Sequence, residues 1–362
     1  MSANEQIMST YDAEVHVYES LEKRTYELLS TLLDDAGVEY HSLTSRCKER
    51  KSLEGKISRE GKNYCELSDL TDVVGFRITT YFAGDVDKVA ELIEKELILD
   101  EDNSIDKRKA AEPDRFGYMS LHLVASHKDE RTCLPEYKCC AGKRFEIQIR
   151  TILQHAWAEI EHDMGYKSES AVPQTVRRRF SRLAGLLELA DEEFQIIRNQ
   201  LSKYKDELPE KIKTEPQDIL LDAESLIEFV KTDELVKEFN KVFIPSIADE
   251  LDDSMDAGDY NRLLGLIGIT TVAELSEACH NSQQYFEPFI RRWFADIDWE
   301  YKVLSLGVSI FYVMFITMAL KMDVAEIKKI FITWNLDEQT ADDFSEKIVQ
   351  VIELVQDNEA VY

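Results

Sequence analysis

The segment from residue 144 to residue 163, RFEIQIRTILQHAWAEIEHD, changes its hydrophobic period within a few positions. Phe145, Ile147 and Ile149 alternate with polar residues, which predicts a strand with one buried face. Apolar residues then recur at every fourth position from Ile152 to Ile160, which predicts a helix. Both elements also carry more polar side chains on one side than a buried strand and helix need. This polar face is interpreted as a metal site, a nucleotide site or a solvated surface.

Other segments with strand or helix patterns indicate a chain of two domains. Strand patterns cover 72–82, 118–126 and 143–150, and helical patterns cover 8–36, 85–97, 151–163 and 173–208. A further helix is predicted to start after Leu43, with Thr44 or Ser45 as its N-cap, and to carry SRCKERKSLEGK. The charged stretch 206–218 contains two prolines and is the best linker candidate. It separates a domain at 1–208 from one at 216–362.

Only helical patterns follow this linker, and one of them has no charged residue from 303 to 320. Its length meets the requirement for a membrane span. Acidic residues lie on both sides of it, at 296, 298, 300 and 323, so a buried central helix is favoured over a membrane anchor. The amphipathic segments 283–296 and 338–355 are expected to cover it. We therefore expect no membrane association.

The charge of the chain restricts its partners. The formal net charge is −28, and residues 201–362 contain 15 Lys and Arg against 33 Asp and Glu. Such an acidic chain disfavours nonspecific attraction to nucleic acid, so basic residues in the first half must act locally. Six cysteines scattered over 362 residues, without an apolar leader, predict reduced thiols and a cytoplasmic protein.

A column of cations marks the first candidate site. Arg46, Lys48, Ser52 and Lys56 follow the spacing R-x-K-x-x-x-S-x-x-x-K. On a helix the last three lie one above another, at i, i+4 and i+8. Cations beside a hydroxyl suit a polyphosphate, because charge-assisted contacts to phosphate oxygens are strong. The alternative is a solvated charged helix.

Carboxylates mark the second candidate site. Asp72 opens a predicted strand that continues through Gly75 and Arg77. A carboxylate at a strand start can hold Mg²⁺, which takes few protein ligands and prefers phosphate oxygens for the rest. Glu146 can join Asp72 if their strands are neighbours. A zinc site is disfavoured, since H-E-x-x-H is absent. The alternative for Asp72 and Arg77 is a turn residue and an edge residue.

An exposed aromatic residue marks the third candidate site. Gly117 and Tyr118 precede a strand that carries Ser120 and His122 on the same side as Tyr118. A ring beside a glycine can stack on a nucleotide base. The alternative is an ordinary strand start with a packed tyrosine.

Taken together, in this order and spacing, the motifs resemble the synthetase domain of the RelA/SpoT family over about residues 10–205. That family's pattern runs R-x-K-x-x-x-S-x-x-x-K, D-x-x-G-x-R, G-Y-x-S-x-H, E-I-Q-I-R-T and W-x-x-x-E-H. In this sequence the matching residues are Arg46/Lys48/Ser52/Lys56, Asp72/Gly75/Arg77, Gly117/Tyr118/Ser120/His122, Glu146/Gln148/Arg150 and Trp157/Glu161/His162.

The resemblance implies a nucleotidyltransferase-like α+β fold, with helices flanking a mixed β-sheet, followed here by an all-helical C-terminal domain. The implied reaction moves pyrophosphate from ATP to the 3′-hydroxyl of GDP or GTP, with Mg²⁺ as cofactor. Asp72 and Glu146 are implied to be catalytic and to hold the metal, and Glu146 either serves the metal or accepts the 3′-hydroxyl proton. The implied ATP-binding residues are Arg46, Lys48, Ser52, Lys56 and Arg77, and the implied acceptor-binding residues are Tyr118, Ser120, His122, Gln148 and His155.

The acceptor loop departs from the family pattern. Residues 113–118 read P-D-R-F-G-Y, where many relatives have P-K-x-N-G-Y. This leaves the 3′ end of tRNA, or an adenine nucleotide, as alternative acceptors. Local basic groups, at 143–144, 177–179 and 182, favour tRNA, but the net charge of −28 disfavours it, and a small nucleotide stays the preferred acceptor. A non-catalytic nucleotide-binding module is the least favoured interpretation, because every charged position of the pattern is present.

The resemblance also implies a synthetase without the family's hydrolase domain, since only about forty residues precede Arg46. The domain at 216–362 has no cluster of catalytic side chains in its sequence. We expect it to regulate or assemble the enzyme, through a homo-oligomer or a protein partner.

Overall fold

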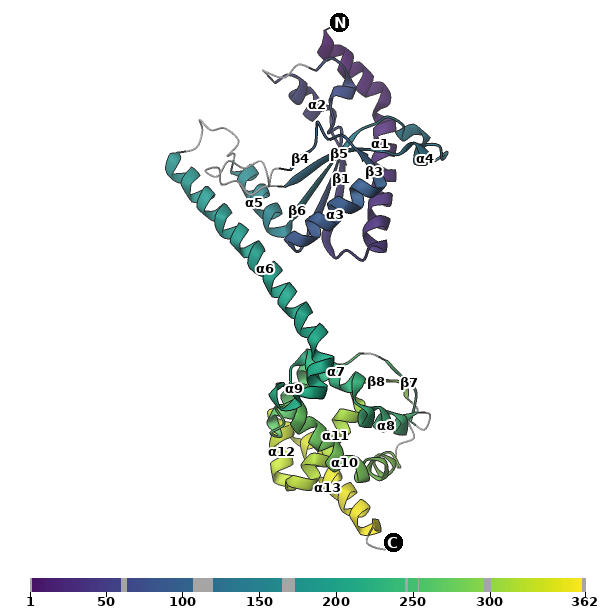
Figure 1. Cartoon of the computed structure of the whole chain (residues 1–362), viewed down its shortest axis with the longest axis vertical. Helices are drawn as coiled ribbons and strands as arrows, with labels where there is room; N and C mark the ends of the chain where they lie inside the picture. Colours follow the sequence, from purple (N-terminus) through teal and green to yellow (C-terminus); the bar gives the residue numbers. More distant parts are fainter. Residues whose placement is uncertain are drawn as a thin grey trace. The chain divides into compact units, whose positions relative to one another are not determined.

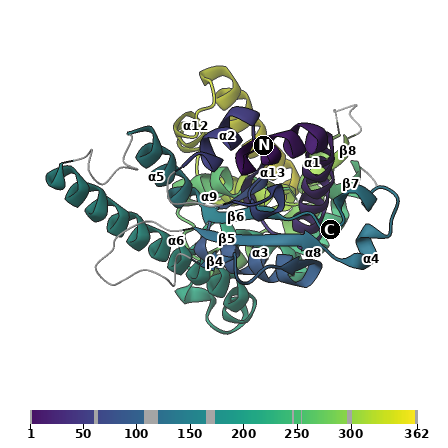
Figure 2. The ribbon, with the colours of Figure 1, turned by 90° about the horizontal axis from the view of Figure 1, so that it is seen from above.

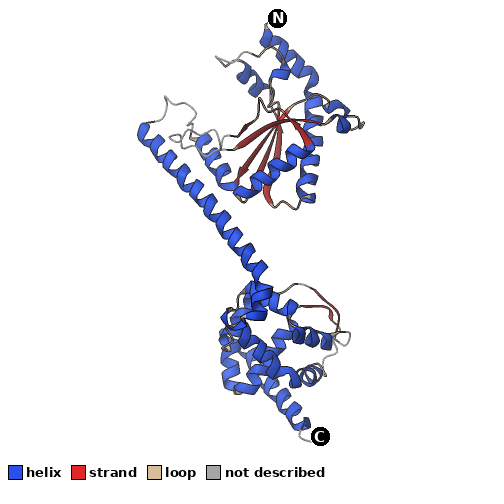
Figure 3. Ribbon diagram, viewed as in Figure 1, coloured by secondary structure: helices blue, strands red, loops and turns tan. Residues whose placement is uncertain are grey.

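The computed structural model describes residues 2–59, 64–106, 120–164, 173–244, 247–252, 254–295 and 301–359. The chain divides into two compact units, Met1–Asn199 and Gln200–Tyr362. Figure 1 shows both units, and Figure 3 shows that strands are concentrated in the N-terminal one.

The N-terminal unit is an α+β structure built on one sheet. Its sheet has the strand order β1-β2-β6-β5-β3, with β4 paired to β5. Among the described strands of this sheet, only β2 and β6 pair in parallel, so the sheet is mixed as predicted. The elements in chain order are α1 (Ala3–Asp35), β1 (Tyr40–Cys47), α2 (Arg50–Ile57), β2 (Val74–Thr80), α3 (Ala83–Glu96), β3 (Leu97–Leu99), β4 (Ile105–Asp106), β5 (Leu121–His127), α4 (Asp129–Thr132), β6 (Phe145–Thr151), α5 (Ile152–Asp163) and α6 (Gln174–Thr214), with short 3₁₀ helices at Leu67–Asp69 and Lys138–Cys140.

The two faces of this sheet differ in chemistry. Phe76 of β2 and Phe145, Ile147 and Ile149 of β6 are buried in one hydrophobic core with residues of α1 and α3. The side chains between them in sequence point to the other face and are mostly polar, because successive strand residues alternate. Figure 2 shows β5 and β6 side by side in this sheet.

Helix α1 is longer than predicted, and its ends explain why. Ser2 caps the first turn in a capping box with Glu5. At the other end, Gly37 has a φ of 62°. The amide of Gly37 donates to the carbonyl of Asp34, and the amide of Val38 donates to that of Leu33. These are the two hydrogen bonds of a Schellman motif, which needs a residue such as glycine in the left-handed region.

The helix predicted to start after Leu43 is wrong in its first part. Tyr40–Cys47 is strand β1, antiparallel to β2, and the helix begins only at Arg50. Arg46 therefore lies on a strand and Lys48 lies between strand and helix, while Ser52 and Lys56 are on α2. The hydroxyl residues that we interpreted as N-caps are strand residues, because pairing with β2 outweighs local capping preference.

The predicted linker at 206–218 is also wrong in part. Helix α6 continues through Pro209 to Thr214, and a 3₁₀ helix follows at Pro216–Asp218. Leu208, beside the proline, is buried in the core of the C-terminal unit. Packing of this turn therefore outweighs the amide hydrogen bond that proline cannot make.

The C-terminal unit is helical, apart from one pair of short parallel strands that the sequence analysis missed (Figure 3). The strands are short, and one of them, ADELD, carries three acids and shows no clear alternation. The elements are α7 (Ala223–Thr232), α8 (Glu234–Phe243), β7 (Ala248–Asp252), α9 (Ala257–Leu266), α10 (Val272–Trp293), β8 (Tyr301–Ser305), α11 (Val308–Lys321), α12 (Val324–Thr333) and α13 (Glu338–Glu359).

The uncharged segment 303–320 forms the centre of this unit, as expected. Most of it is helix α11, and its residues from Ile310 to Met318 are nearly all buried. Helices α10 and α13 both contact α11; α10 contains residues 283–293 of one predicted amphipathic segment, and α13 contains the other, 338–355. Across the described ranges, no helix is long and apolar enough to cross a membrane.

A chain that ends at Asn199 is predicted to fold on its own. The large core of the N-terminal unit contains no residue of the C-terminal unit. Circular dichroism of residues 1–199 should show near-native helix content and a single cooperative transition on heating. A chain that ends at Lys211 is the comparison: it retains Leu208 without its core and should be less soluble. Loss of cooperative unfolding in the shorter chain would contradict the boundary.

Candidate active site

On the polar face of the sheet, residues of four strands lie side by side. Across the ladder, Arg46 of β1 lies opposite Gly75 of β2, and Gly75 lies opposite Glu146 of β6. Two residues further along the strands, Arg77 pairs with Gln148, which pairs with His122 of β5. Residues far apart in sequence thus form two adjacent rows on one face.

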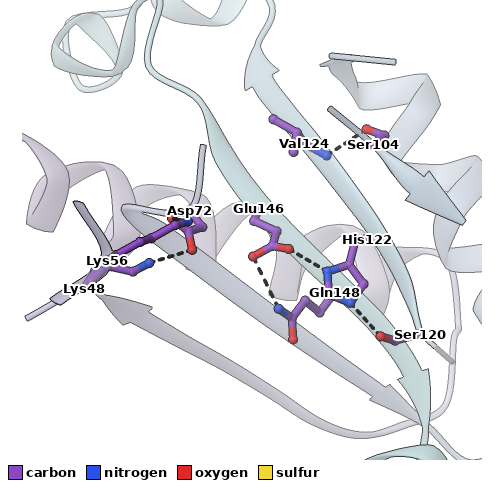
Figure 4. A network of polar contacts seen from close by, with 9 residues as sticks. All are labelled: Lys48, Lys56, Asp72, Ser104, Ser120, His122, Val124, Glu146 and Gln148. Atoms are coloured by element: carbon purple, nitrogen blue, oxygen red, sulfur yellow. Dashed lines mark hydrogen bonds and ion pairs between the residues drawn. The ribbon is translucent and has the colours of Figure 1, made fainter. Parts of the chain in front are cut away.

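Two lysines converge on Asp72, just before β2. Lys48 Nζ donates to Asp72 Oδ2 at 2.6 Å, and Lys56 Nζ lies 2.7 Å from Oδ1 (Figure 4). Burial alone raises the pKa of Asp72, but hydrogen bonds and charges from Lys48 and Lys56 outweigh it and hold the pKa below its usual value. Burial lowers the pKa of Lys48, and Asp72 opposes this. The carboxylate therefore stays ionised among cations.

Glu146 is held from the other side by β5 and β6. His122 Nδ1 lies 2.6 Å from Glu146 Oε1, and Gln148 Nε2 donates to Oε2 at 3.3 Å (Figure 4). Ser120 Oγ lies 2.7 Å from the other ring nitrogen of His122. Burial raises the pKa of Glu146, but hydrogen bonding and charge from His122 lower it below its usual value. Glu146 is thus a fixed, ionised hydrogen-bond acceptor.

The two carboxylates occupy one site. The charge of Asp72 acts on Glu146 and raises its pKa, opposing His122. Their side chains are 19% and 18% exposed, respectively, so both are accessible to a small ligand. Gly75 lies beside them, and a Cβ there would meet only Arg46 Nε, at 3.9 Å. No other described residue comes within 4 Å of this position, which leaves room for a ligand among the described residues.

A second cluster centres on Glu159 of α5. Its Oε1 accepts from Arg77 at 3.0 Å and from Arg150 at 3.3 Å, and lies 3.6 Å from His155 Nδ1. Burial and the charge of Arg77 lower the pKa of Arg150 to about 10. Burial, then Arg150 and Arg77, lower the pKa of His155. This cluster holds its histidine neutral beside two arginines.

The orphaned nitrogens of this cluster indicate anion binding. Arg77 Nε and Arg150 Nε are buried, and neither has a hydrogen-bond partner among the described residues. Buried guanidinium donors without partners are costly, so an anionic ligand that accepts from them gains free energy.

The structure brings together most of the predicted site residues. Asp72, Lys48 and Lys56 meet at one carboxylate, and Glu146, Gln148, His122 and Ser120 form one hydrogen-bonded chain. Arg46 and Arg77 lie on the same face. Ser52 is exposed on α2. Tyr118 lies outside the described residues.

Three details differ from the sequence analysis. His155 contacts Glu159 rather than the residues around His122. Arg150 and Glu159 were left out of the predicted site, although the i, i+4 spacing of His155 and Glu159 was a usable signal. The apolar stripe of α5 was also misassigned: Ile160 is 51% exposed, and Trp157 is buried instead against Phe180 and Ala184 of α6.

The donors present fit a magnesium ion better than a zinc ion. Asp72 Oδ1 is buried, and it is ion-paired with Lys56 Nζ at 2.7 Å, so a metal that binds there would take the place of that ammonium. Two carboxylates that leave the remaining positions to phosphate and water suit Mg²⁺. The described residues contain no group of three or more His, Cys, Asp and Glu that could hold a metal.

Comparisons with known proteins match the N-terminal unit. A family model described as "Region found in RelA / SpoT proteins" matches residues 45–171. GTP pyrophosphokinase YjbM of Bacillus subtilis (strain 168) is 30% identical over 176 residues, which are 47% of this chain and 76% of that protein. GTP pyrophosphokinase YwaC of the same strain is 30% identical over 165 residues, 43% and 73% respectively. A crystal structure of small alarmone synthetase 1 from Bacillus subtilis, bound to its product pppGpp, is 25% identical, with a TM-score of 0.45 over 54% of this chain and 99% of that one.

Replacing His122 with alanine is predicted to raise the pKa of Glu146. The variant loses the hydrogen bond and charge that lower this pKa, and burial and Asp72 remain to raise it. In the wild type, a depressed carboxyl pKa stabilises the fold above the unfolded-state value of about 4.3, and this stability is lost as pH falls through the folded-state pKa. The variant should lose less stability on acidification.

Carboxyl ¹³C chemical shifts measured across a pH titration test this prediction. Asp72 is the internal control, because Lys48 and Lys56 hold its pKa low without His122. An unchanged titration of Glu146 would show that the His122 contact is not electrostatically important.

Proposed function

The chain belongs to the RelA/SpoT family of pyrophosphokinases, and on that premise we propose that it transfers pyrophosphate from ATP to the 3′-hydroxyl of GDP or GTP. The observation that supports this most is the convergence of Lys48 and Lys56 on Asp72 beside Glu146. Cations, an ionised carboxylate and a fixed acceptor are what phosphoryl-type transfer to a hydroxyl requires.

The ATP phosphates are assigned to the basic side of this face. Lys48 and Lys56 carry two ammonium groups that a polyphosphate can share with Asp72. Arg46 lies on the adjacent strand and is exposed, while Arg77 has a buried nitrogen without a partner among the described residues. Guanidinium and ammonium donors on three sides can fix the phosphate chain before transfer.

In the proposed step, the 3′-oxygen of the acceptor forms a bond to the β-phosphorus of ATP. The bond from that phosphorus to the oxygen of the α-phosphate breaks, and AMP leaves. Glu146 is the proposed proton acceptor for the 3′-hydroxyl, because its lowered pKa keeps it ionised and His122 and Gln148 fix its orientation.

Mg²⁺ is the proposed cofactor, and it would neutralise charge on the transferred phosphates. Asp72 is its proposed ligand, since its carboxylate is ionised and close enough to Glu146 to affect that residue's pKa, and a metal could replace the ammonium of Lys56 at Oδ1. If a water molecule accepts the proton of the 3′-hydroxyl instead, Glu146 would serve as a second ligand of the metal. The two carboxylates have different partners, two lysines for Asp72 and a histidine for Glu146. This difference supports metal binding by Asp72 and proton transfer by Glu146.

The acceptor is assigned to the β5 side. Ser120, His122 and Gln148 form a polar edge there, and Tyr118 is the proposed stacking residue, although it lies outside the described residues. His155 is assigned to the acceptor more weakly, because it lies with Arg77 and Arg150. A neutral imidazole beside two arginines suits a sugar hydroxyl or phosphate at the boundary of the two nucleotides.

We also propose that the C-terminal unit regulates or assembles the enzyme. Its large core is self-contained, with α11 at the centre.

Purified protein supplied with ATP labelled at its terminal phosphates, Mg²⁺ and separate acceptors tests the proposed reaction. We expect label in GDP or GTP, and none when Mg²⁺ is chelated. GMP, ADP and total tRNA are the comparison acceptors. Label found only in tRNA, or only in an adenine nucleotide, would show that the acceptor is not GDP or GTP. If the acceptor is tRNA, the arginines of α6 are the first residues to examine.

Asp72→Asn and Glu146→Gln are each predicted to lower kcat by at least roughly 10²-fold, because each removes charge where the transition state needs it. Only Asp72→Asn should also raise the Mg²⁺ concentration needed for half-maximal rate. Asp102→Asn and Glu94→Gln are matched controls, since both acids are exposed outside the site. Equal Mg²⁺ requirements in the two site variants would contradict the division of roles.

A further inference from the structure

Glu159 of α5 is the shared ion-pair partner of two arginines on different strands. Its Oε1 atom accepts from Arg77 Nη1 on β2 at 3.0 Å and from Arg150 Nη2 on β6 at 3.3 Å. Arg77 pairs with Gln148 across the parallel strands, so the two arginines lie two residues apart on the same face of the sheet. One carboxylate oxygen therefore joins both guanidinium groups.

This carboxylate offsets a repulsion between the two arginines. Burial, and then the charge of Arg77, lower the pKa of Arg150, so the two guanidinium groups are close enough to act on each other. Burial raises the pKa of Glu159, but the charges of Arg77 and Arg150 outweigh it and hold that pKa below its usual value, so Glu159 is ionised at neutral pH. Across the described residues, neither arginine forms an ion pair with any other carboxylate.

The two arginines differ in their freedom to move. The side chain of Arg150 is 6% exposed, whereas that of Arg77 is 32% exposed. A buried charge that loses its partner is strongly unfavourable, and salt screens its repulsion from a neighbouring charge only weakly. Without the charge of Glu159, the guanidinium of Arg77 would therefore turn away from Arg150 and toward solvent.

We propose that Glu159 is a positioning residue for the donor nucleotide: it holds Arg77 on the polar face, against repulsion from Arg150, where the phosphates of ATP bind. The proposal rests on the proposed function only in its assignment of ATP to Arg77. Among the described residues, the polar contacts of Glu159 are with Arg77, Arg150 and His155, not with Asp72 or Glu146. Glu159 should therefore affect ATP binding and leave the transfer step nearly unchanged.

Calorimetric titration of the full-length chain with α,β-methylene ATP and Mg²⁺ tests this role. In this analogue a carbon replaces the oxygen whose bond to the β-phosphorus breaks, so binding is measured without transfer. Glu159→Gln should raise the dissociation constant at least about five-fold, because the pair it breaks is partly buried. The value of kcat at saturating ATP should change by less than about two-fold, since only binding is affected.

A double-mutant cycle with Arg77 separates positioning from a structural role. In an Arg77→Met background, Glu159→Gln should cause no further loss of affinity, because the side chain through which it acts is gone. A merely structural role would lower affinity equally in both backgrounds. Arg150→Gln combined with Glu159→Gln should recover most of the affinity that Glu159→Gln loses, since the repulsion on Arg77 is also removed.

Glu94→Gln is the control for loss of an exposed carboxylate and should bind like the wild type. Circular dichroism confirms that each variant is folded. If Arg77→Met binds too weakly to measure, recovery in the Arg150→Gln and Glu159→Gln double variant decides the question.

An equal loss in both backgrounds, or a double variant that stays as weak as Glu159→Gln alone, would overturn the proposal. Tighter binding by Glu159→Gln would overturn it as well, because Glu159 would then compete with phosphate for Arg77. The binding cycle does not depend on the acceptor. Failure of transfer to GDP or GTP would therefore reject the proposed reaction without deciding the role of Glu159.

Discussion

The parallel pairing of β2 with β6 is the constraint on which the rest of the N-terminal unit depends. The other strand pairs that the structure describes in this sheet are antiparallel. Because β2 and β6 run the same way in adjacent positions, Asp72, just before β2, comes beside Glu146 near the start of β6. Strands paired in parallel need a long connection, and residues 81–144, which include α3 and β5, supply it. The carboxylate site and the polar edge beside it are thus consequences of a single register.

The sequence predicted those features that depend on short-range pattern. The change of period near Thr151 correctly located the end of β6 and the start of α5, since a capping box begins at that residue. The motif spacing singled out Asp72, Lys48 and Lys56, which share one ion-paired cluster, and Glu146 and His122, which lie within hydrogen-bond distance of each other. The long apolar segment was correctly interpreted as a buried helix, because charge on its flanks argued against a membrane.

Features decided by long-range packing were not predictable in this way. Tyr40–Cys47 has only one buried residue, Leu43, so it shows little strand pattern until β2 is placed beside it. Pro209 indicates a helix end by itself, yet α6 continues through it. Glu159 became recognisable as an ion-pair centre only when β2 and β6 brought Arg77 and Arg150 to it. These cases share a cause: each depends on a neighbour distant in sequence.

The pairing of Lys48 and Lys56 with Asp72 has a consequence for how nucleotides enter. A binding site with free lysines attracts mobile ions from solution, and a phosphate then displaces them, so affinity falls steeply as salt rises. Here an internal carboxylate already neutralises part of that charge. An incoming polyphosphate exchanges with a counter-ion built into the protein, and fewer solution ions are released. Nucleotide affinity at this site should therefore depend only weakly on ionic strength, despite the chain's net charge of −28.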